Sequence, residues 1–192
     1  MNTNYYSSQS EEFISNTKDC NMNDLYNFFE KYLKKDAKNI LYIGFGSGRD
    51  SMYFSKKYVV TSIDPTPEFC KYGKEIGLKN VLCQKVEDMT FENEFDRIWA
   101  CASLLHLDSK DLRKAFNNCY ISLKKDGVMY CSFKYGEFEG IRGNRKYLDL
   151  NENSFNEYIK DIPFKIADIK ITDDVRQDRI EKWLNVILIK GN

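Results

Sequence analysis

The stretch Ile40-Leu41-Tyr42-Ile43-Gly44-Phe45-Gly46-Ser47-Gly48-Arg49-Asp50 decides the fold of this chain. Its apolar half is typical of a buried strand, and three alternate glycines follow that strand directly, before a helix predicted over 47–57. Glycine tolerates positive φ angles and lets a ligand lie against the backbone, and the first turn of a helix presents unpaired N–H groups. The pattern therefore predicts a ligand-binding loop or, more plainly, a tight turn between a strand and a helix.

A carboxylate stands at the end of the next predicted strand. Residues 58–63 are apolar and β-branched, and Asp64 follows them, 20 residues after Gly44. Neighbouring parallel strands end at the same edge of a sheet, where a carboxylate in this position hydrogen-bonds a ribose diol. An Asp before a Pro is also a common turn former. The combination of glycine loop and acid favours a cofactor that contains a nucleoside.

Strands and helices alternate along most of the chain, and this pattern predicts an α/β fold with a mostly parallel sheet covered on both faces. Gly77 is expected to end one helix and Asp108 to cap another, and 125–127 is expected to form a turn. The last two strands have no helix between them, which indicates an antiparallel hairpin. We predict a single domain over residues 1–192. The expected helices cover 22–35, 47–57, 66–76, 109–123 and 152–159, and the expected strands cover 39–43, 58–63, 81–84, 95–101, 128–133, 164–172 and 182–190.

Composition excludes several classes of protein. The 192 residues include 42% apolar and 30% charged residues, which is ordinary for a globular domain. Lys plus Arg and Asp plus Glu both number 29, and this neutral balance argues against a nucleic-acid partner. The apolar runs are too short for a membrane span, and the first residues have no signal-peptide core. We therefore expect a soluble, cytoplasmic protein.

The cysteines and the single histidine do not form a metal-binding pattern. Six cysteines are widely spaced, without a CxxC pair, and a zinc site would need sulfurs from distant segments. Most of the cysteines lie in apolar stretches, where a free thiol behaves as a small hydrophobic group. We expect reduced core cysteines and no metal.

The chain resembles the class I S-adenosylmethionine-dependent methyltransferases, and in particular small bacterial members such as the tellurite-resistance-like group. The matching segments are LYIGFGSGRDSMYF (41–54), VTSIDPTPEFC (60–70), EFDRIWACASLLHL (94–107) and KKDGVMYCSFKYGE (124–137). The resemblance implies a Rossmann-like sheet of seven strands and S-adenosylmethionine as cofactor, with S-adenosylhomocysteine as product. It also implies a set of cofactor-binding residues: Gly44, Phe45, Gly46, Gly48, Asp64, Pro65, Val86, Glu87, Ala100, Cys101 and Ser103.

Two positions depart from the pattern of this family. Tyr42 stands where an acid often helps to hold the ammonium of the cofactor, and Lys85 stands where an Asp usually reaches the adenine amine. Backbone groups, Glu87 or Asp88 are the available substitutes near the adenine. The pair of glycine loop and ribose-binding acid is unaffected.

Three further segments are expected near the reacting groups. His106 follows the fourth strand and is the candidate general base, because imidazole titrates near neutral pH; the alternative is a histidine packed between two leucines. The insert 134–149 is expected over the acceptor site, with Tyr135, Arg145 and Tyr147 as candidate substrate contacts, or else as a solvated surface loop. The N-terminal segment 1–36 is expected to be helical and to serve either as a lid or as a packed end.

Three functions remain open at this point. The first is methyl transfer to a small-molecule acceptor, which the resemblance favours. The second is an NAD(P)-dependent oxidoreductase, against which stands the GxGxG spacing in place of GxGxxG. The third is a non-catalytic module that binds a nucleoside cofactor.

Overall fold

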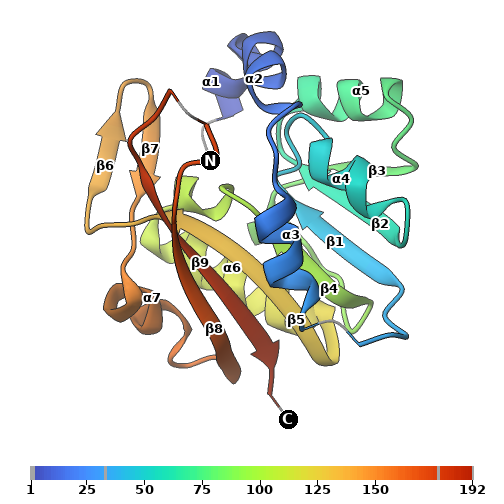
Figure 1. Ribbon diagram of the computed structural model, residues 1–192, viewed down its shortest axis with the longest axis vertical. Helices are drawn as coiled ribbons and strands as arrows, with labels where there is room; N and C mark the ends of the chain where they lie inside the picture. Colours follow the sequence, from blue (N-terminus) through green and yellow to red (C-terminus); the bar gives the residue numbers. More distant parts are fainter. Residues whose placement is uncertain (1–2, 33, 177, 192) are drawn as a thin grey trace.

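The computed structural model describes residues 3–32, 34–176 and 178–191, and within these ranges the chain forms a seven-stranded sheet and a separate two-stranded hairpin (Figure 1). The strands are β1 (Asn39–Ile43), β2 (Val59–Asp64), β3 (Asn80–Cys83), β4 (Phe95–Ala100), β5 (Leu123–Lys134), β6 (Glu139–Arg142), β7 (Arg145–Leu148), β8 (Phe164–Asp173) and β9 (Lys182–Lys190). The helices are α1 (Thr3–Ser8), α2 (Ser10–Thr17), α3 (Asn23–Glu30), α4 (Arg49–Phe54), α5 (Pro67–Glu75), α6 (Ser109–Ser122) and α7 (Glu152–Ile159), with short 3₁₀ turns η1 (Val86–Asp88) and η2 (Leu104–His106).

The strand order in the large sheet is β3-β2-β1-β4-β5-β9-β8. The first five strands in this order pair in parallel, while β5–β9 and β8–β9 pair antiparallel. The chain winds from β1 out to β3 and then returns to place β4 on the other side of β1. Such a reversal opens a crevice at the carboxyl ends of the two central strands, which is where open α/β sheets bind ligands. The predicted fold class is confirmed.

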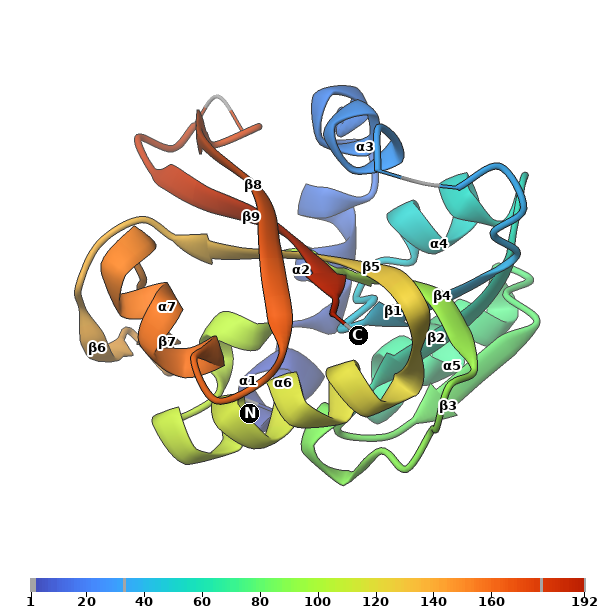
Figure 2. The ribbon, with the colours of Figure 1, turned by 90° about the horizontal axis from the view of Figure 1, so that it is seen from below.

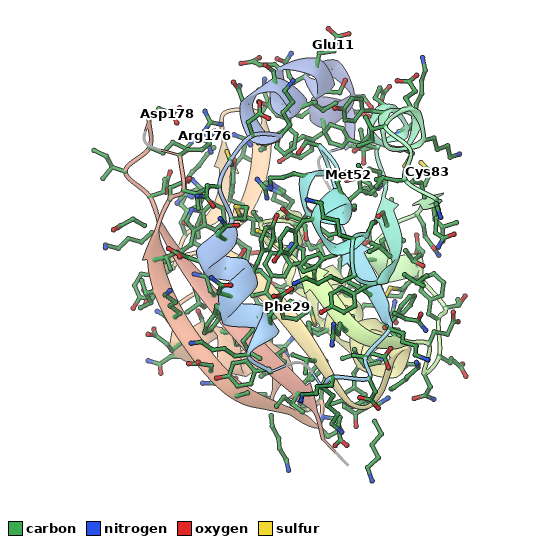
Figure 3. The ribbon with its side chains drawn as sticks, turned by 45° about the vertical axis from the view of Figure 1, so that its right-hand side comes forward. Glu11, Phe29, Met52, Cys83, Arg176 and Asp178 are labelled. Atoms are coloured by element: carbon green, nitrogen blue, oxygen red, sulfur yellow. The ribbon has the colours of Figure 1, made fainter. Side chains whose placement is uncertain are left out.

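Two apolar clusters fill the two faces of the sheet. Figure 2 shows α3 and α4 on one side of the sheet and α6 on the other. The first side is rich in aromatic rings; Phe29 from α3 lies at its centre and is fully buried against Trp99 and Phe54 (Figure 3). The other side is built around α6 and α7, whose buried Phe116 and Phe155 pack edge to face. The central strands β1 and β4 are therefore covered on both faces, which explains why they are almost entirely buried.

Several local signals work as predicted. Gly77 has a φ of +89° just past the end of α5, a conformation that favours glycine. Asp108 accepts a hydrogen bond from the backbone N–H of Asp111 and caps α6. Helix α7 begins with a reciprocal cap between Asn151 and Ser154. These caps hold the helices that carry the loops of the crevice.

Other elements differ from the prediction. Residues 125–127 form a bulge within β5 instead of a turn before it. Phe95 of β4 pairs with Leu123 of β5, but Arg97, two residues further along β4, pairs with Val128, five residues further along β5. The predicted helices 22–35 and 47–57 are shorter, as α3 and α4, and Leu33 lies outside the described residues. The insert 134–149 contains the hairpin β6–β7, because Arg142 and Arg145 pair across a two-residue Gly-Asn connection.

In the described part of the chain, no helix has the length and apolar character needed to cross a membrane.

Candidate active site

The glycine loop after β1 has the backbone geometry that the sequence predicts. Gly44, Gly46 and Gly48 have φ angles of +70°, +49° and +72°, and Gly48 is the N-cap residue of α4. A Cβ at position 44 would lie 2.4 Å from the Cβ of Ser103, so the loop after β4 approaches this glycine closely. Glycine is required here both for its φ angle and for the close contact.

Asp64 lies beside this loop, at the end of β2. Its carboxylate accepts hydrogen bonds from the backbone N–H groups of Gly46, at 3.2 Å, and Thr66, at 2.9 Å. Burial raises its pKa to about 6, although both N–H groups oppose the shift. An ionised carboxylate has about four acceptor positions. Two of them are used, which leaves capacity for two further donors such as a ribose diol.

A cavity of about 310 Å³ opens between the glycine loop, the N-terminal helices and the β6–β7 hairpin. This volume is at the lower end of the range for small-molecule sites. The loop between β8 and β9 closes its far end. Among the residues that line it are Tyr6, Phe13, Gly44, Phe45, Gly46, Arg49, Cys101, His106, Lys134, Arg145, Tyr147, Arg176, Arg179 and Trp183.

A fully buried carboxylate supports one wall of the cavity. Asp50 accepts hydrogen bonds from the hydroxyls of Tyr26 and Tyr42, from the indole N–H of Trp99 and from the guanidinium of Arg49. Burial opposes ionisation of Asp50, but Arg49 and the other donors outweigh it and lower the pKa of this carboxyl. Tyr42 thus serves to hold Asp50, which in turn holds Arg49.

His106 is placed by hydrogen bonds on both ring nitrogens. Nδ1 lies 2.8 Å from the backbone oxygen of Lys146, and Nε2 lies 2.7 Å from the hydroxyl of Tyr6. A carbonyl oxygen only accepts, so Nδ1 carries the proton and Nε2 presents its lone pair. Burial, reinforced by the charges of Arg145 and Lys134, lowers the pKa of His106 to about 4 despite the opposing bond to Lys146. The imidazole is therefore neutral at physiological pH.

The N-terminal helices pack over the glycine loop. The ring of Phe13 lies directly against Gly46, because a Cβ added to this glycine would come within 2.8 Å of the ring. The same ring packs against the ring of Phe69 of α5, with 5.3 Å between the two centroids. Arg49 donates to the backbone oxygen of Thr17 at the end of α2. Burial raises the pKa of Tyr6 to about 12, so its hydroxyl stays protonated and donates to His106. The segment is a packed cover over the loop.

The β6–β7 hairpin, whose ribbon is at the left of Figure 1, contributes Arg145 and Tyr147 to the lining of the cavity. The guanidinium of Arg145 lies over the rings of Tyr5 and Tyr147, at 5.0 and 5.2 Å from their centroids. Within the described ranges, neither Arg145 nor Arg179 forms an ion pair with a carboxylate, whereas Lys134 pairs with Glu181. Both guanidinium groups thus border the cavity without a paired carboxylate in the described ranges, although Glu12, Asp173 and Asp174 also line it.

The predicted residues separate into three groups: those that line the cavity, those that adjoin the lining and those that lie outside it. The cavity brings together seven of them: Gly44, Phe45, Gly46, Cys101, His106, Arg145 and Tyr147. Asp64, Gly48 and Ser103 adjoin the lining through the contacts given above. Pro65, Val86, Glu87 and Ala100 lie outside the lining. Tyr135 also lies outside it, with an exposed ring and a hydroxyl that donates to Glu152.

Sequence reasoning did not find the pair formed by Arg49 and Asp50. The available signal was the Arg-Asp dipeptide directly after a glycine loop, at the start of a helix. Only the fold shows that two tyrosines and a tryptophan from three other elements converge on Asp50.

Comparison with known proteins agrees with the geometry. Residues 41–131, from within β1 to within β5, match a family described as a methyltransferase domain. The matched region is just under half of the chain and contains both the glycine loop and Asp64. Solved structures of similar fold hold S-adenosylhomocysteine, which supports S-adenosylmethionine as the cofactor.

Three particular proteins illustrate the similarity. Over 148 residues the chain is 27% identical to phosphoethanolamine N-methyltransferase of Plasmodium falciparum; the match covers 69% of this chain and 55%, about half, of that protein. The structure of 1,6-didemethyltoxoflavin-N1-methyltransferase of Burkholderia thailandensis, with bound 1,6-didemethyltoxoflavin and S-adenosylhomocysteine, matches with a TM-score of 0.76 and 19% identity, over 100% of this chain and 91% of that one. The N-methyltransferase NodS of Bradyrhizobium japonicum, in complex with S-adenosylhomocysteine, matches with a TM-score of 0.73 and 16% identity, over 97% and 98% of the two chains.

The residues of the site fit S-adenosylmethionine. Besides the spare acceptor positions of Asp64, two buried oxygens have no hydrogen-bond partner among the described residues: Oε2 of Glu87 and Oγ of Ser103. Ser103 touches Gly44, and Glu87 lies in η1 between β3 and β4. Unsatisfied buried oxygens are costly unless a ligand pairs with them. No group of three or more potential metal ligands occurs in the described ranges.

Proposed function

We propose that the protein transfers the methyl group of S-adenosylmethionine to a small-molecule acceptor that bears an anionic group. The observation that supports this most is the single cavity that joins the glycine loop, His106 and the guanidinium groups of Arg145 and Arg179. The cofactor, when bound, supplies a methyl carbon activated by the neighbouring sulfonium. Gly44, Gly46 and Asp64 would hold it, and the guanidinium groups would hold the acceptor by charge-assisted hydrogen bonds.

Two observations favour an anionic acceptor: the positive charges at the cavity and the substrate named for one relative. The named substrate of the Plasmodium falciparum relative is phosphoethanolamine, a small molecule with a phosphate group. In this chain, Arg145 and Arg179 border the cavity without a carboxylate partner in the described part. Guanidinium binds phosphate and carboxylate in bidentate fashion. The acceptor's anionic group would therefore lie on the hairpin side of the cavity.

His106 is proposed to take the proton that the acceptor loses. Its Nε2 holds a lone pair because Nδ1–H donates to Lys146, and the hydroxyl of Tyr6 occupies that lone pair in this structure. The positive charge of Arg145 is one cause of the low pKa of His106. An anion on Arg145 would compensate this charge and raise the pKa of the imidazole. Binding of the acceptor would thus strengthen the base that serves it.

Alignment and exclusion of water are the other contributions of the chain. The rings of Tyr6, Phe13 and Tyr147 cover the cavity between the lid and the hairpin. An in-line displacement depends strongly on the relative placement of donor and acceptor, and placement alone can account for a large part of the rate. The N-terminal segment, as a lid over this region, would complete the enclosure.

A labelling experiment tests this function. The purified protein is incubated with methyl-labelled S-adenosylmethionine and a small-molecule extract separated by anion exchange. We expect label in a fraction retained by the anion exchanger, and we expect Arg179→Gln to lower kcat/KM for that acceptor without changing the affinity for S-adenosylhomocysteine. Label confined to neutral or cationic fractions would refute the anionic acceptor. Binding of S-adenosylhomocysteine without labelling of any fraction would favour the non-catalytic module.

A further inference from the structure

Two cysteines lie next to the peptide that carries the ribose-binding acid. Cys70 is buried on α5, and its thiol donates to the backbone oxygen of Asp64 at 3.2 Å. Cys83 is the last residue of β3, is exposed, and its thiol lies 3.8 Å from the backbone oxygen of Pro65. The two sulfurs thus contact consecutive carbonyl groups of one short segment. Figure 3 shows Cys83 at the edge of the molecule, where a solute can reach it.

The strand register and the second contact of Cys70 place the two thiols together. Asp64 and Cys83 are direct partners in the parallel pairing of β2 and β3. Cys70 also approaches the backbone oxygen of Leu82, the residue before Cys83, at 3.8 Å. After burial, the hydrogen bond from the Cys83 side chain is the largest cause that raises the pKa of Cys70. A buried thiol and an exposed thiol therefore lie close together beside the site, each against a carbonyl of the segment 64–65.

We propose that Cys70 and Cys83 form a reversible disulfide that weakens binding of the cofactor at Asp64. The proposal rests on the proposed role of Asp64 in the function above. Both cysteines are free thiols in this structure, which would be the form that binds the cofactor.

The bond forms by thiol–disulfide exchange with a low-molecular-weight disulfide such as oxidised glutathione. The thiolate of exposed Cys83 attacks one sulfur of that disulfide, and one glutathione thiolate leaves. Cys70 then loses its proton to solvent and attacks the sulfur of Cys83, and the second glutathione thiolate leaves. Two protein thiols are oxidised, and one glutathione disulfide is reduced to two glutathione molecules.

The disulfide acts on the site through the segment 64–66. Its formation removes the S–H donors from the carbonyl groups of Asp64 and Pro65 and draws α5 toward the end of β3. The N–H of Thr66, at the start of α5, is one of the two groups that fix the carboxylate of Asp64. A shift of this helix start relative to β2 would misplace the carboxylate with respect to the glycine loop.

Mass spectrometry and calorimetry test the proposal on the full chain. The protein is equilibrated in glutathione buffers of increasing oxidation, then alkylated and mapped, while its affinity for S-adenosylhomocysteine is measured by titration calorimetry. In the oxidising buffers we expect the mass of the protein to fall by two hydrogens and the map to contain a disulfide-linked Cys70–Cys83 peptide. The affinity for S-adenosylhomocysteine should fall by about tenfold, the effect of losing one hydrogen bond to a charged group. Dithiothreitol should restore the affinity. By linkage, saturating S-adenosylhomocysteine should shift the thiol–disulfide equilibrium toward the thiols by the same factor.

The variant Cys83→Ser changes an exposed residue and should keep its full affinity for S-adenosylhomocysteine in oxidising buffer. The control is Cys20→Ser, at a half-buried cysteine outside the pair, which should lose affinity on oxidation as the wild type does. Six alkylated thiols in every buffer, or a disulfide between other cysteines, would overturn the proposal. So would a Cys70–Cys83 disulfide that leaves the affinity unchanged. In these outcomes the reduced protein still binds S-adenosylhomocysteine and the proposed function stands. If the reduced protein does not bind it, both proposals fail.

Discussion

At the scale of single residues, His106 contacts both segments that enclose the cavity, the N-terminal helices and the β6–β7 hairpin. Its Nε2 meets Tyr6 of the N-terminal segment and its Nδ1 meets the backbone of Lys146 in the hairpin. Because both bonds restrain the ring, the orientation and the tautomer of the imidazole are set by segments 40 and 100 residues away. Burial lowers its pKa to about 4, so the imidazole stays neutral throughout the physiological range.

The rate should reflect this lowered pKa. At saturating S-adenosylmethionine, kcat/KM for the acceptor should show no step between about pH 5.5 and 8, because His106 in the free enzyme titrates near pH 4. The kcat profile should show its acid limb at higher pH, because a bound anion compensates Arg145. His106→Ala should lower kcat by about a hundredfold or more with unchanged affinity for S-adenosylhomocysteine. Unchanged kcat in this variant would remove His106 from the mechanism.

Cofactor affinity should depend on the ionisation of Asp64. Since burial raises the pKa of this carboxyl to about 6, the fraction that is ionised falls as the pH drops below that value. Only the ionised form accepts both ribose hydroxyls, so the Kd for S-adenosylhomocysteine should rise about tenfold between pH 7 and pH 5. Titration calorimetry measures this, with Asp64→Asn as a variant that is weaker but has no such pH dependence. A flat profile for the wild type would contradict the assignment.

The predictable part of the site is the part built on local sequence. Glycines 44 and 46 and Asp64 are recognisable because the backbone geometry of a strand–loop–helix unit demands them. The environment of Asp50 is not predictable, because Tyr26, Tyr42 and Trp99 reach it from different elements through tertiary packing. Nor does the sequence show that the hydroxyl of Tyr6 reaches an imidazole 100 residues away.

At the scale of elements, the N-terminal helices are the strongest departure from a plain α/β sheet. Their sequences are mostly polar and their few apolar residues give weak helical periodicity, and neither α1 nor α2 contains a buried residue. They are held by partners on the domain: Phe13 on Phe69 and Tyr6 on His106. Such a segment has a low cost of opening compared with the core, which suits a lid.

Phe13 should control the exchange of the cofactor. Its ring lies against Gly46, and Asp64 is only 5% exposed, so we expect α2 to move when an adenosyl group reaches Asp64. Phe13→Ala should raise the dissociation rate of S-adenosylhomocysteine by up to about tenfold, since a fully buried Phe contributes about 1.5–3 kcal/mol and Phe13 is half-buried. Stopped-flow measurement checks this, with Ser15→Ala, an exposed change on the same helix, as control. Equal rates in the wild type and Phe13→Ala would contradict the role of the lid.

Helix α7 offers a test of local stability away from the chemistry. Asn151 accepts from the N–H of Ser154 and donates to Glu137 of the segment before β6. Asn151→Ala should lower the free energy of unfolding by about 1 kcal/mol, the usual value of such a cap. Asn153→Ala, at an exposed position inside the same helix, should change it by less than about 0.5 kcal/mol. Denaturant unfolding of both variants compares the two values, and equal effects would show that the cap is not the stabilising contact.

The elements that the sequence predicts well are those with strong periodicity or caps, such as α6 and α7. The hairpin β6–β7 was expected only as an insert, although Gly143 and Asn144 between two short polar strands are a hairpin signal. The strands there are four residues each and lack the apolar alternation that usually marks them. In β5 the bulge at 125–127 appears in the sequence as a turn, because Asp126 and Gly127 are turn residues in either case.

At the scale of the molecule, the strand order creates the site. Asp64, His106 and Arg145 are far apart in the chain, and the return of β4 to the side of β1 brings their loops to one edge of the sheet. The alternation of strands and helices in the sequence predicts this class of fold, since parallel strands require crossover helices. It does not predict the cover formed by α1, α2 and the hairpin, because their positions depend on long-range contacts.

Titration of S-adenosylhomocysteine into the folded, reduced protein tests the central claim most directly. We predict one binding site per chain, and a Kd that rises about 10- to 100-fold in Asp64→Ala, since hydrogen bonds to a charged group contribute about 1.5–3 kcal/mol. A flat titration with a well-folded protein, or equal affinity in wild type and Asp64→Ala, would contradict the claim that the glycine loop and Asp64 together bind this cofactor.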